Sequence, residues 1–172
     1  MNKYTGEYRH IVNELIKKSF PSLKNRKLFI LETYHPIYYW CWAFAFCFFK
    51  INIIGVSPRT RKMDLISKKG LFVHELCHIE NFRKNTKNRN FLIYRYIKFL
   101  LNKNYAKKNE RQTDIDGIKK GYGREIWHMK IFISKKESRK MYERRKEMGY
   151  LTPQEIRGYI KKFKNHRNLR VK

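Results

Sequence analysis

The apolar positions of this chain recur with two different periods, which divide the first part of the sequence into a helix and several strands. In residues 6–18, apolar side chains three and four positions apart predict an amphipathic helix. Residues 27–32 are predicted to form a short strand. Between residues 37 and 54, large aromatic side chains alternate with Ala and Cys, and this period of two predicts strands. The phase of the alternation changes at Phe49, which predicts a bulge or a tight turn between two strands.

Helical spacing returns in the second part of the chain. Gly70 and the polar run before it are expected to form the entry to the first of these helices. Gly149 is expected to end a long polar helix, and Thr152 and Glu155 form a capping box with a proline at the first helical position. The tail from residue 165 is expected to fray. The helices predicted here are residues 70–82, 91–101, 106–120, 123–148 and 153–164.

These elements predict an α+β fold, with a small twisted β-sheet packed on helices 70–82 and 106–120 and with further C-terminal helices. The chain has 172 residues, of which 42% are hydrophobic, and this is enough to build the core of a single domain. Within that domain we expect a core over about residues 1–123 and a basic helical C-terminal extension over about residues 124–172.

The formal net charge of +27 is extreme, with 41 Lys and Arg against 14 Asp and Glu. Such a charge can indicate an anionic partner, either nucleic acid or an acidic membrane surface. The basic residues are spread along the entire chain, however, and no recognised nucleic-acid-binding motif accompanies them. The charge alone therefore leaves a solvated surface and a dedicated anionic partner both open.

The location of the protein is also constrained by composition. Three cysteines without a CxxC spacing, and an N-terminus without an apolar signal core, favour the cytoplasm. The 18 mainly apolar residues 37–54 approach the length of a membrane span. Their alternation and the charge of Lys50 fit strands better, so we expect no firm membrane insertion. Membrane association through residues 37–54 is the minor alternative.

Five consecutive residues carry the strongest chemical signal: His74, Glu75, Leu76, Cys77 and His78. On a helix, the two histidines share one face and lie one turn apart, so both can bind one zinc ion. Glu75 then sits beside the metal-bound water. A site of this kind would carry out metal-assisted hydrolysis, most often of a peptide bond.

A catalytic zinc usually takes three protein ligands, so a third must come from elsewhere in the chain. Acidic residues are scarce, yet Glu110, Asp114 and Asp116 all lie on the predicted helix 106–120. Glu110 and Asp114 are one turn apart, so Glu110 could bind the metal while Asp114 accepts a hydrogen bond from a zinc-binding histidine. Asp116 falls about 200° from Asp114 around the helix. Our order for the third ligand is Glu110, then Asp114, then Asp116.

The two motifs together resemble those of the gluzincin metallopeptidases, whose second motif is Glu-x-x-x-Asp on a separate glutamate helix. More closely, they resemble the small soluble minigluzincins, which are relatives of the catalytic domains of membrane-embedded CAAX-prenyl and heat-shock metalloproteases. Residues 54–59 before the first motif and residues 121–123 after the second also fit this group. The resemblance covers roughly residues 51–123 and, more weakly, residues 150–153.

The resemblance implies a role for each motif residue. His74, His78 and Glu110 would be the zinc ligands, Glu75 the general base and acid, and Asp114 the carboxylate that orients a ligand. The implied activity is that of a zinc-dependent endopeptidase acting on peptide or protein substrates.

Three matters remain open at the level of the sequence: the place of the substrate, the donor to the oxyanion and the alternative function. An extended substrate would lie along a sheet edge, for which the strand over residues 51–56 is the candidate. The oxyanion could receive a hydrogen bond from Tyr122, His128 or Tyr142. The alternative function is that of a basic nucleic-acid-binding protein in which the zinc site is structural or degenerate.

Overall fold

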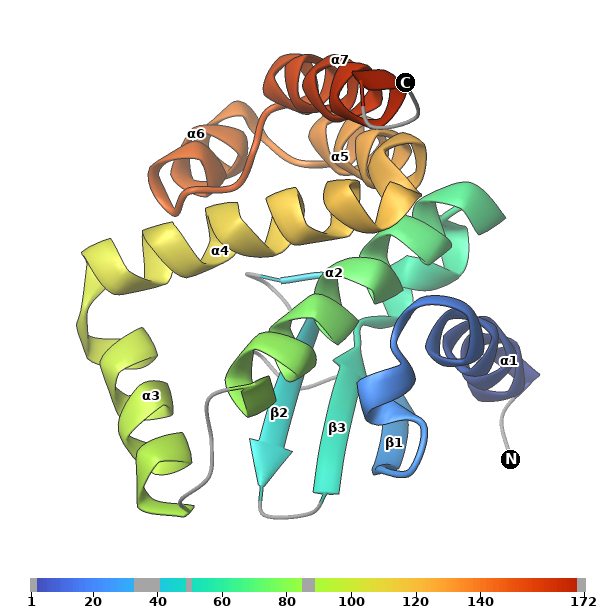
Figure 1. The fold of residues 1–172 in the computed structure, drawn as a ribbon, viewed down its shortest axis with the longest axis vertical. Helices are drawn as coiled ribbons and strands as arrows, with labels where there is room; N and C mark the ends of the chain where they lie inside the picture. Colours follow the sequence, from blue (N-terminus) through green and yellow to red (C-terminus); the bar gives the residue numbers. More distant parts are fainter. Residues whose placement is uncertain (1–2, 33–40, 49–50, 85–88, 170–172) are drawn as a thin grey trace.

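The computed structural model describes residues 3–32, 41–48, 51–84 and 89–169. Within these ranges the chain forms a small sheet and a larger set of helices (Figure 1), which confirms the expected α+β class. Short turns connect some of the elements: η1 (Pro21–Leu23), η3 (Pro58–Lys62) and the π-helical turn η4 (Ile118–Tyr122). The strands and helices are α1 (Lys3–Ser19), β1 (Lys27–Glu32), β2 (Ala43–Phe48), β3 (Ile51–Val56), α2 (Leu65–Lys84), α3 (Arg89–Leu101), α4 (Lys103–Gly117), α5 (Gly123–Lys136), α6 (Arg139–Glu147) and α7 (Pro153–Leu169).

The three strands pair in the order β1–β3–β2, with β3 parallel to β1 and antiparallel to β2. Strand β3 is therefore central and has a hydrogen-bonded neighbour on each side. The expectation that residues 51–56 offer an edge to an extended substrate is wrong, because both edges of this strand are already paired. The bulge or tight turn expected at Phe49 lies outside the described residues.

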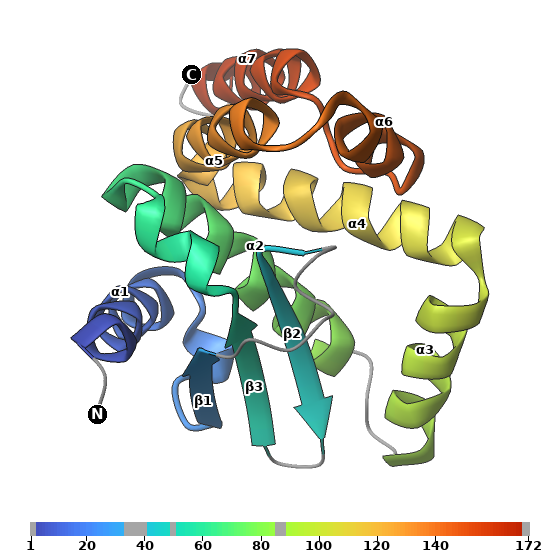
Figure 2. The same cartoon turned by 180° about the vertical axis from the view of Figure 1, so that it is seen from behind.

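Helix α2 crosses one face of the sheet, in front of β2 and β3 in Figure 1, while Figure 2 shows the opposite face. In β2 the small residues Ala43 and Cys47 are buried, whereas Phe46, on the other face, is 38% exposed. The alternation expected for this strand is thus present, with Phe46 on the outer face. Small side chains on the inner face leave room for the helix and for a cavity beside it.

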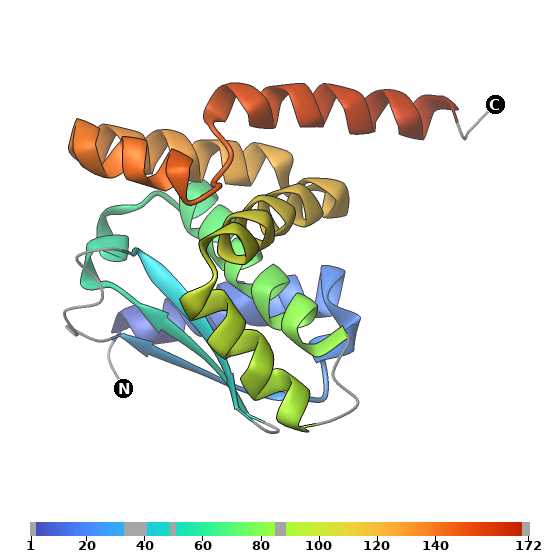
Figure 3. The same ribbon diagram turned by 90° about the vertical axis from the view of Figure 1, so that its left-hand side faces the viewer.

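Helix α2 lies at the centre of the fold, between the sheet and the C-terminal helices (Figure 3). Every residue from Gly70 to Glu80 is buried. Helix α5 packs so closely on α2 that a Cβ atom added at Gly70 would lie 2.2 Å from the carbonyl oxygen of Glu125. The expected role of Gly70 at the helix entry is wrong, since α2 begins at Leu65. This glycine instead permits the close approach of two helices.

Residues 123–148 form two helices, α5 and α6, rather than the single long helix expected. Between them Glu137 is extended, with φ −99° and ψ 153°, and the Ser138 side chain caps α6 by accepting a hydrogen bond from the Met141 amide. The Glu137 carboxylate accepts hydrogen bonds from Arg145 and from the Trp42 indole. Contacts from outside the helix therefore hold the break in place.

The predicted capping box at the start of α7 is confirmed. The Thr152 amide donates to Glu155 Oε2 (2.8 Å), and the Glu155 amide donates to Thr152 Oγ1 (3.2 Å). Fraying from residue 165 is wrong, because α7 continues to Leu169. In the described part of the chain, no helix is both long and apolar enough to cross a membrane.

Replacing Gly70 with Ala is expected to lower the free energy of unfolding by about 1–3 kcal/mol, because the new methyl group must displace the α5 backbone. The matched control is Gly158→Ala in α7, where an added Cβ would have no atom within 4 Å. That change should raise stability by about 0.5–1 kcal/mol, since Ala is the better helix former. Urea unfolding measures both, and equal effects of the two substitutions would contradict the packing role of Gly70.

Candidate metal centre

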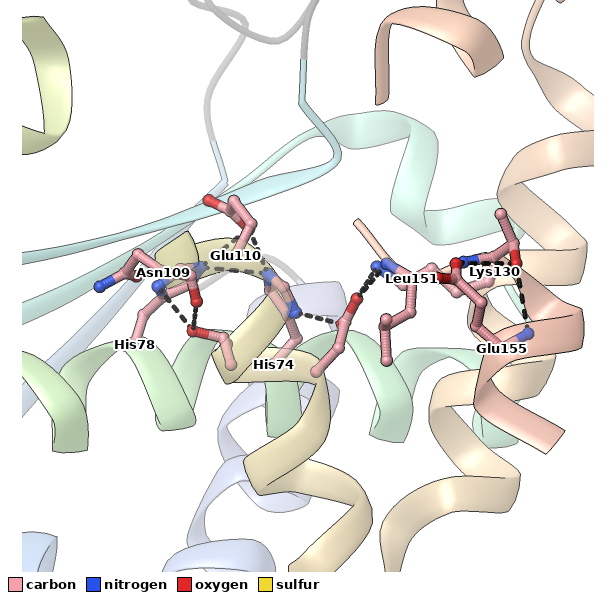
Figure 4. A network of polar contacts seen from close by, with 10 residues as sticks. His74, His78, Asn109, Glu110, Lys130, Leu151 and Glu155 are labelled. Carbon is pink, nitrogen blue, oxygen red and sulfur yellow. Dashed lines mark hydrogen bonds and ion pairs between the residues drawn. The ribbon is translucent and has the colours of Figure 1, made fainter. Parts of the chain in front are cut away.

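Helices α2 and α4 cross so that the predicted ligands face one another (Figure 4). His74 and His78 extend from α2, and Glu110 extends from α4. The two Nε2 atoms are 3.1 Å apart, and Glu110 Oε2 lies 3.2 Å from His74 Nε2 and 3.3 Å from His78 Nε2. All three side chains are buried. The structure thus brings together the three residues that the motifs single out.

Asp114 fixes the orientation of the His74 ring. Its Oδ1 atom lies 2.8 Å from His74 Nδ1, and since a carboxylate only accepts, Nδ1 carries the proton of this hydrogen bond. Neutral His74 then has its lone pair on Nε2, which points toward Glu110. This arrangement is the one expected for Asp114 from its position one turn after Glu110.

Thr113 performs the same task for His78. The Thr113 hydroxyl donates to the carbonyl oxygen of Asn109 (2.9 Å) and lies 3.3 Å from His78 Nδ1. Because its only hydrogen is directed to Asn109, the hydroxyl oxygen accepts from Nδ1 of His78. The lone pair of neutral His78 is therefore also on Nε2.

Neutral His74 and His78 consequently direct two nitrogen lone pairs at each other and at the Glu110 carboxylate. Three electron-pair donors this close, and away from water, repel one another unless a cation lies among them. The cation can be a proton or a metal ion. His74, His78 and Glu110 therefore form a buried group that could hold a metal ion.

The second oxygen of Asp114 is held by the C-terminal part of the chain. Asp114 Oδ2 accepts a hydrogen bond from the Leu151 amide (3.0 Å) and an ion-paired one from Lys130 Nζ (2.8 Å). Leu151 directly precedes the capping box of α7, visible around Glu155 in Figure 4. Gly149, with φ +95°, turns the chain so that it enters this region. Asp114 thus joins the histidine on α2 to two later segments, α5 and the turn before α7.

Glu75 lies next to the three donors and lines two cavities. The larger, of about 240 Å³, also has His78 and Glu110 in its wall, together with mainly apolar side chains from β2, α2 and α3. The smaller, of about 30 Å³, has room for about one water molecule and is lined by His74, Glu75 and Tyr150, among others. The group therefore has space beside it for a small reactant as well as for a larger side chain.

The buried charges shift one another's pKa values. Burial alone would lower the pKa of His74, but the Asp114 carboxylate beside it and the hydrogen bond that His74 donates to Glu110 raise that pKa to about 9. Burial would raise the pKa of Glu110, but the two histidines hold it well below its ordinary value. Burial raises the pKa of Glu75. In the metal-free chain a proton on His74 thus occupies the group at neutral pH.

The remaining candidates from the sequence lie elsewhere. The Asp116 carboxylate accepts hydrogen bonds from Asn81 and Gln112 and is not among the clustered donors. The Tyr122 hydroxyl lies 2.7 Å from Ser19 Oγ. Among the described residues, neither His128 nor Tyr142 lines either cavity, and the His128 ring instead packs against Trp127 while Lys146 lies over the Tyr142 ring.

Three residues at the site were given no role on the basis of the sequence. Thr113 lies one helical turn after Glu110, so its position on the same face was a usable signal. Lys130 gave none, because only the tertiary fold brings it close, and Tyr150 lies in the weakly resembling stretch 150–153, to which no role was assigned. The Tyr150 ring stacks on His74 with centroids 5.6 Å apart, and Lys130 Nζ lies 4.3 Å from the centre of the same ring.

No protein-family model, curated protein or solved structure matches the chain. The chemistry of the site is therefore inferred from its own residues and their geometry.

Substituting Thr113 with Val, which has nearly the same shape, should weaken metal binding about 10- to 100-fold, because His78 loses the acceptor that fixes its ring. Thr113→Ser keeps the hydroxyl and serves as the matched control, with affinity close to that of the wild type. Competition with a chromophoric chelator measures both constants. Equal losses in Val and Ser variants would show that packing, rather than the hydrogen bond, is what matters.

Metal binding should also strengthen with pH. The ion must displace the His74 proton, whose pKa is about 9 in the metal-free chain. His74 keeps this proton at any pH below its pKa, and the ion then competes with the proton. The affinity for the metal should therefore rise about tenfold per pH unit from about pH 7 and level off above about pH 9. Chelator competition at several pH values tests this. A constant affinity would mean that His74 is already neutral before the metal binds.

Proposed function

We propose that this protein is a zinc-dependent metallopeptidase of the gluzincin type, most similar to the minigluzincins. One observation carries the proposal: His74, His78 and Glu110 place three donor atoms within 3.3 Å of one another. A hydrogen bond at Nδ1 sets the tautomer of each histidine. Glu75 lies beside these donors at the wall of a cavity, where a general base is needed.

Zinc is the ion that fits this group best. Zinc–nitrogen bonds of about 2.0–2.1 Å in a tetrahedron separate neighbouring ligand atoms by about 3.3 Å. The three separations in the structure, 3.1, 3.2 and 3.3 Å, come close to that value. Two imidazoles and one carboxylate are also a donor set of catalytic zinc sites, in which the fourth position stays open to water or substrate.

The residues around the group suit peptide hydrolysis. Zinc held here would polarise a scissile carbonyl and lower the pKa of a water molecule to about 7. Glu75 would take the proton of the attacking water and pass it to the leaving amine. Its pKa, raised by burial, moves toward the neutral range that a general base needs.

Tyr150 is our candidate for the hydrogen-bond donor to the carbonyl oxygen. It lines both cavities together with Glu75. Burial, followed by the charge of Glu110, raises the pKa of Tyr150 well above its ordinary value, so the hydroxyl keeps its proton at neutral pH. A neutral donor in a site shielded from water can stabilise a developing oxyanion.

The larger cavity suggests what the substrate presents beside the scissile bond. Its wall includes Phe44, Phe82, Phe99 and Met148, and its volume of about 240 Å³ is enough for a large side chain. An apolar side chain would bury itself there without leaving a polar group unpaired. Peptides with a bulky apolar residue next to the cleaved bond are therefore the proposed substrates.

Exchanging Glu75 for Gln separates hydrolysis from metal binding. Gln has the size of Glu but cannot take the proton, so we expect about one zinc per chain to be retained while peptidase activity falls at least about 100-fold. His78→Ala should lose both the metal and the activity, because it removes a ligand. Zinc content by elemental analysis and cleavage of a peptide library measure the two properties.

The same variants test the alternative that the protein is a basic nucleic-acid binder with a structural zinc site. If the wild type holds zinc but cleaves no peptide, and if Glu75→Gln leaves nucleic-acid binding unchanged, the peptidase proposal fails. The charge of +27 would then be the better guide to function.

A further inference from the structure

Helix α3 is unusual in being apolar on two sides. Phe99 on its inner side contacts the rings of His78 and Phe82, with centroids 6.3 and 6.2 Å away. The guanidinium of Arg95, also on this side, lies over the Phe82 ring and donates to the Asn81 carbonyl oxygen. Phe99 and Arg95 thus hold the inner side of α3 against α2.

The outer side of α3 carries aliphatic residues that the chain leaves exposed. Ile97, Leu100 and Leu101 are 48%, 76% and 80% exposed. Leu100 and Leu101 follow Ile97 by three and four positions, so the three side chains share one face of the helix. In Figure 3 this helix lies at the outside of the molecule, away from the C-terminal helices. Neighbouring exposed aliphatic side chains on one helix face are a feature of interaction sites.

The stretch of sequence that contains this face is basic. From residue 81 to residue 109 the sequence contains nine Lys and Arg and no Asp or Glu. Three of these, Lys103, Lys107 and Lys108, are exposed on the first turns of α4, directly after Leu101. Aliphatic side chains bordered by lysines are the pattern of helices that lie in the interface of an anionic bilayer.

We infer that the outer face of α3 docks the protein on the surface of an anionic lipid bilayer, with Ile97, Leu100 and Leu101 inserted among the lipids and the lysines of α4 on the headgroups. A second copy of this chain and a nucleic acid fit this face less well. A second copy would bring together two segments that carry basic but no acidic residues, and nucleic acid offers no apolar surface to the leucines.

The geometry limits how deep this contact reaches. Helix α3 has 13 residues, which is shorter than the roughly 20 needed to cross a bilayer, so it would lie in the plane of the interface. Phe99, on the opposite side of the same helix, lines the larger cavity next to His78. Docking would therefore hold one wall of that cavity close to the lipid surface, whatever the cavity does.

The full-length protein should sediment with vesicles of phosphatidylcholine mixed with phosphatidylserine, and not with vesicles of phosphatidylcholine alone. The double substitution Leu100→Asn and Leu101→Asn leaves the charge unchanged and should reduce partitioning about tenfold or more, because it removes the inserted groups. The matched control, Lys161→Ser and Lys162→Ser, removes two exposed charges on α7 and should reduce it far less.

Two further measurements complete the test. Light scattering in the absence of lipid gives the oligomeric state of each variant, and elemental analysis gives its zinc content. The variants should remain folded and keep the wild-type metal content, because the changed residues are exposed. Equal partitioning of the asparagine variant and the wild type would overturn the proposal in favour of unspecific attraction by charge. A wild-type dimer that the asparagine variant abolishes would overturn it in favour of a second copy as partner.

Discussion

Bringing three electron-pair donors together away from water costs free energy, and the packing of α2 against its neighbours must supply it. Helix α2 is buried on almost every side from Gly70 to Glu80, so its two histidines have little freedom to move apart. On α4, Glu110 is placed at the same point by hydrogen bonds one turn further along. The surrounding fold thus holds the three side chains close together, and a cation among them, whether a proton or a metal ion, offsets the repulsion between their lone pairs.

Asp114 links this centre to the C-terminal third of the chain. Lys130 on α5 and the Leu151 amide before α7 both bind its outer oxygen, and the Arg111–Glu155 ion pair (2.8 Å) adds a second tie between α4 and α7. Residues 130–155 are therefore part of the environment of the centre, although no chemical motif lies within them. The carboxylate that orients the His74 ring is thus itself held by contacts from these residues.

The residues that sequence reasoning located are those whose relation is local. His74 with His78, and Glu110 with Asp114, are four positions apart, and helical spacing alone predicts that each pair shares a face. Lys130 and Tyr150 could not be located in this way, because their proximity depends on how α5 and the segment before α7 pack. The central place of β3 and the break at Glu137 also follow from tertiary pairing, which periodicity does not encode.

One tie to Asp114 comes from the main chain. The Leu151 amide donates this hydrogen bond, so almost any amino acid at position 151 can preserve it, and only proline lacks the hydrogen. The ion pair from the Lys130 side chain, in contrast, is lost when the residue at position 130 changes to one without a cationic group. Over evolutionary time the backbone contact should survive drift at position 151, whereas position 130 should admit few replacements. A hydrogen bond donated by the main chain therefore leaves no conserved residue at position 151, although the centre requires the contact.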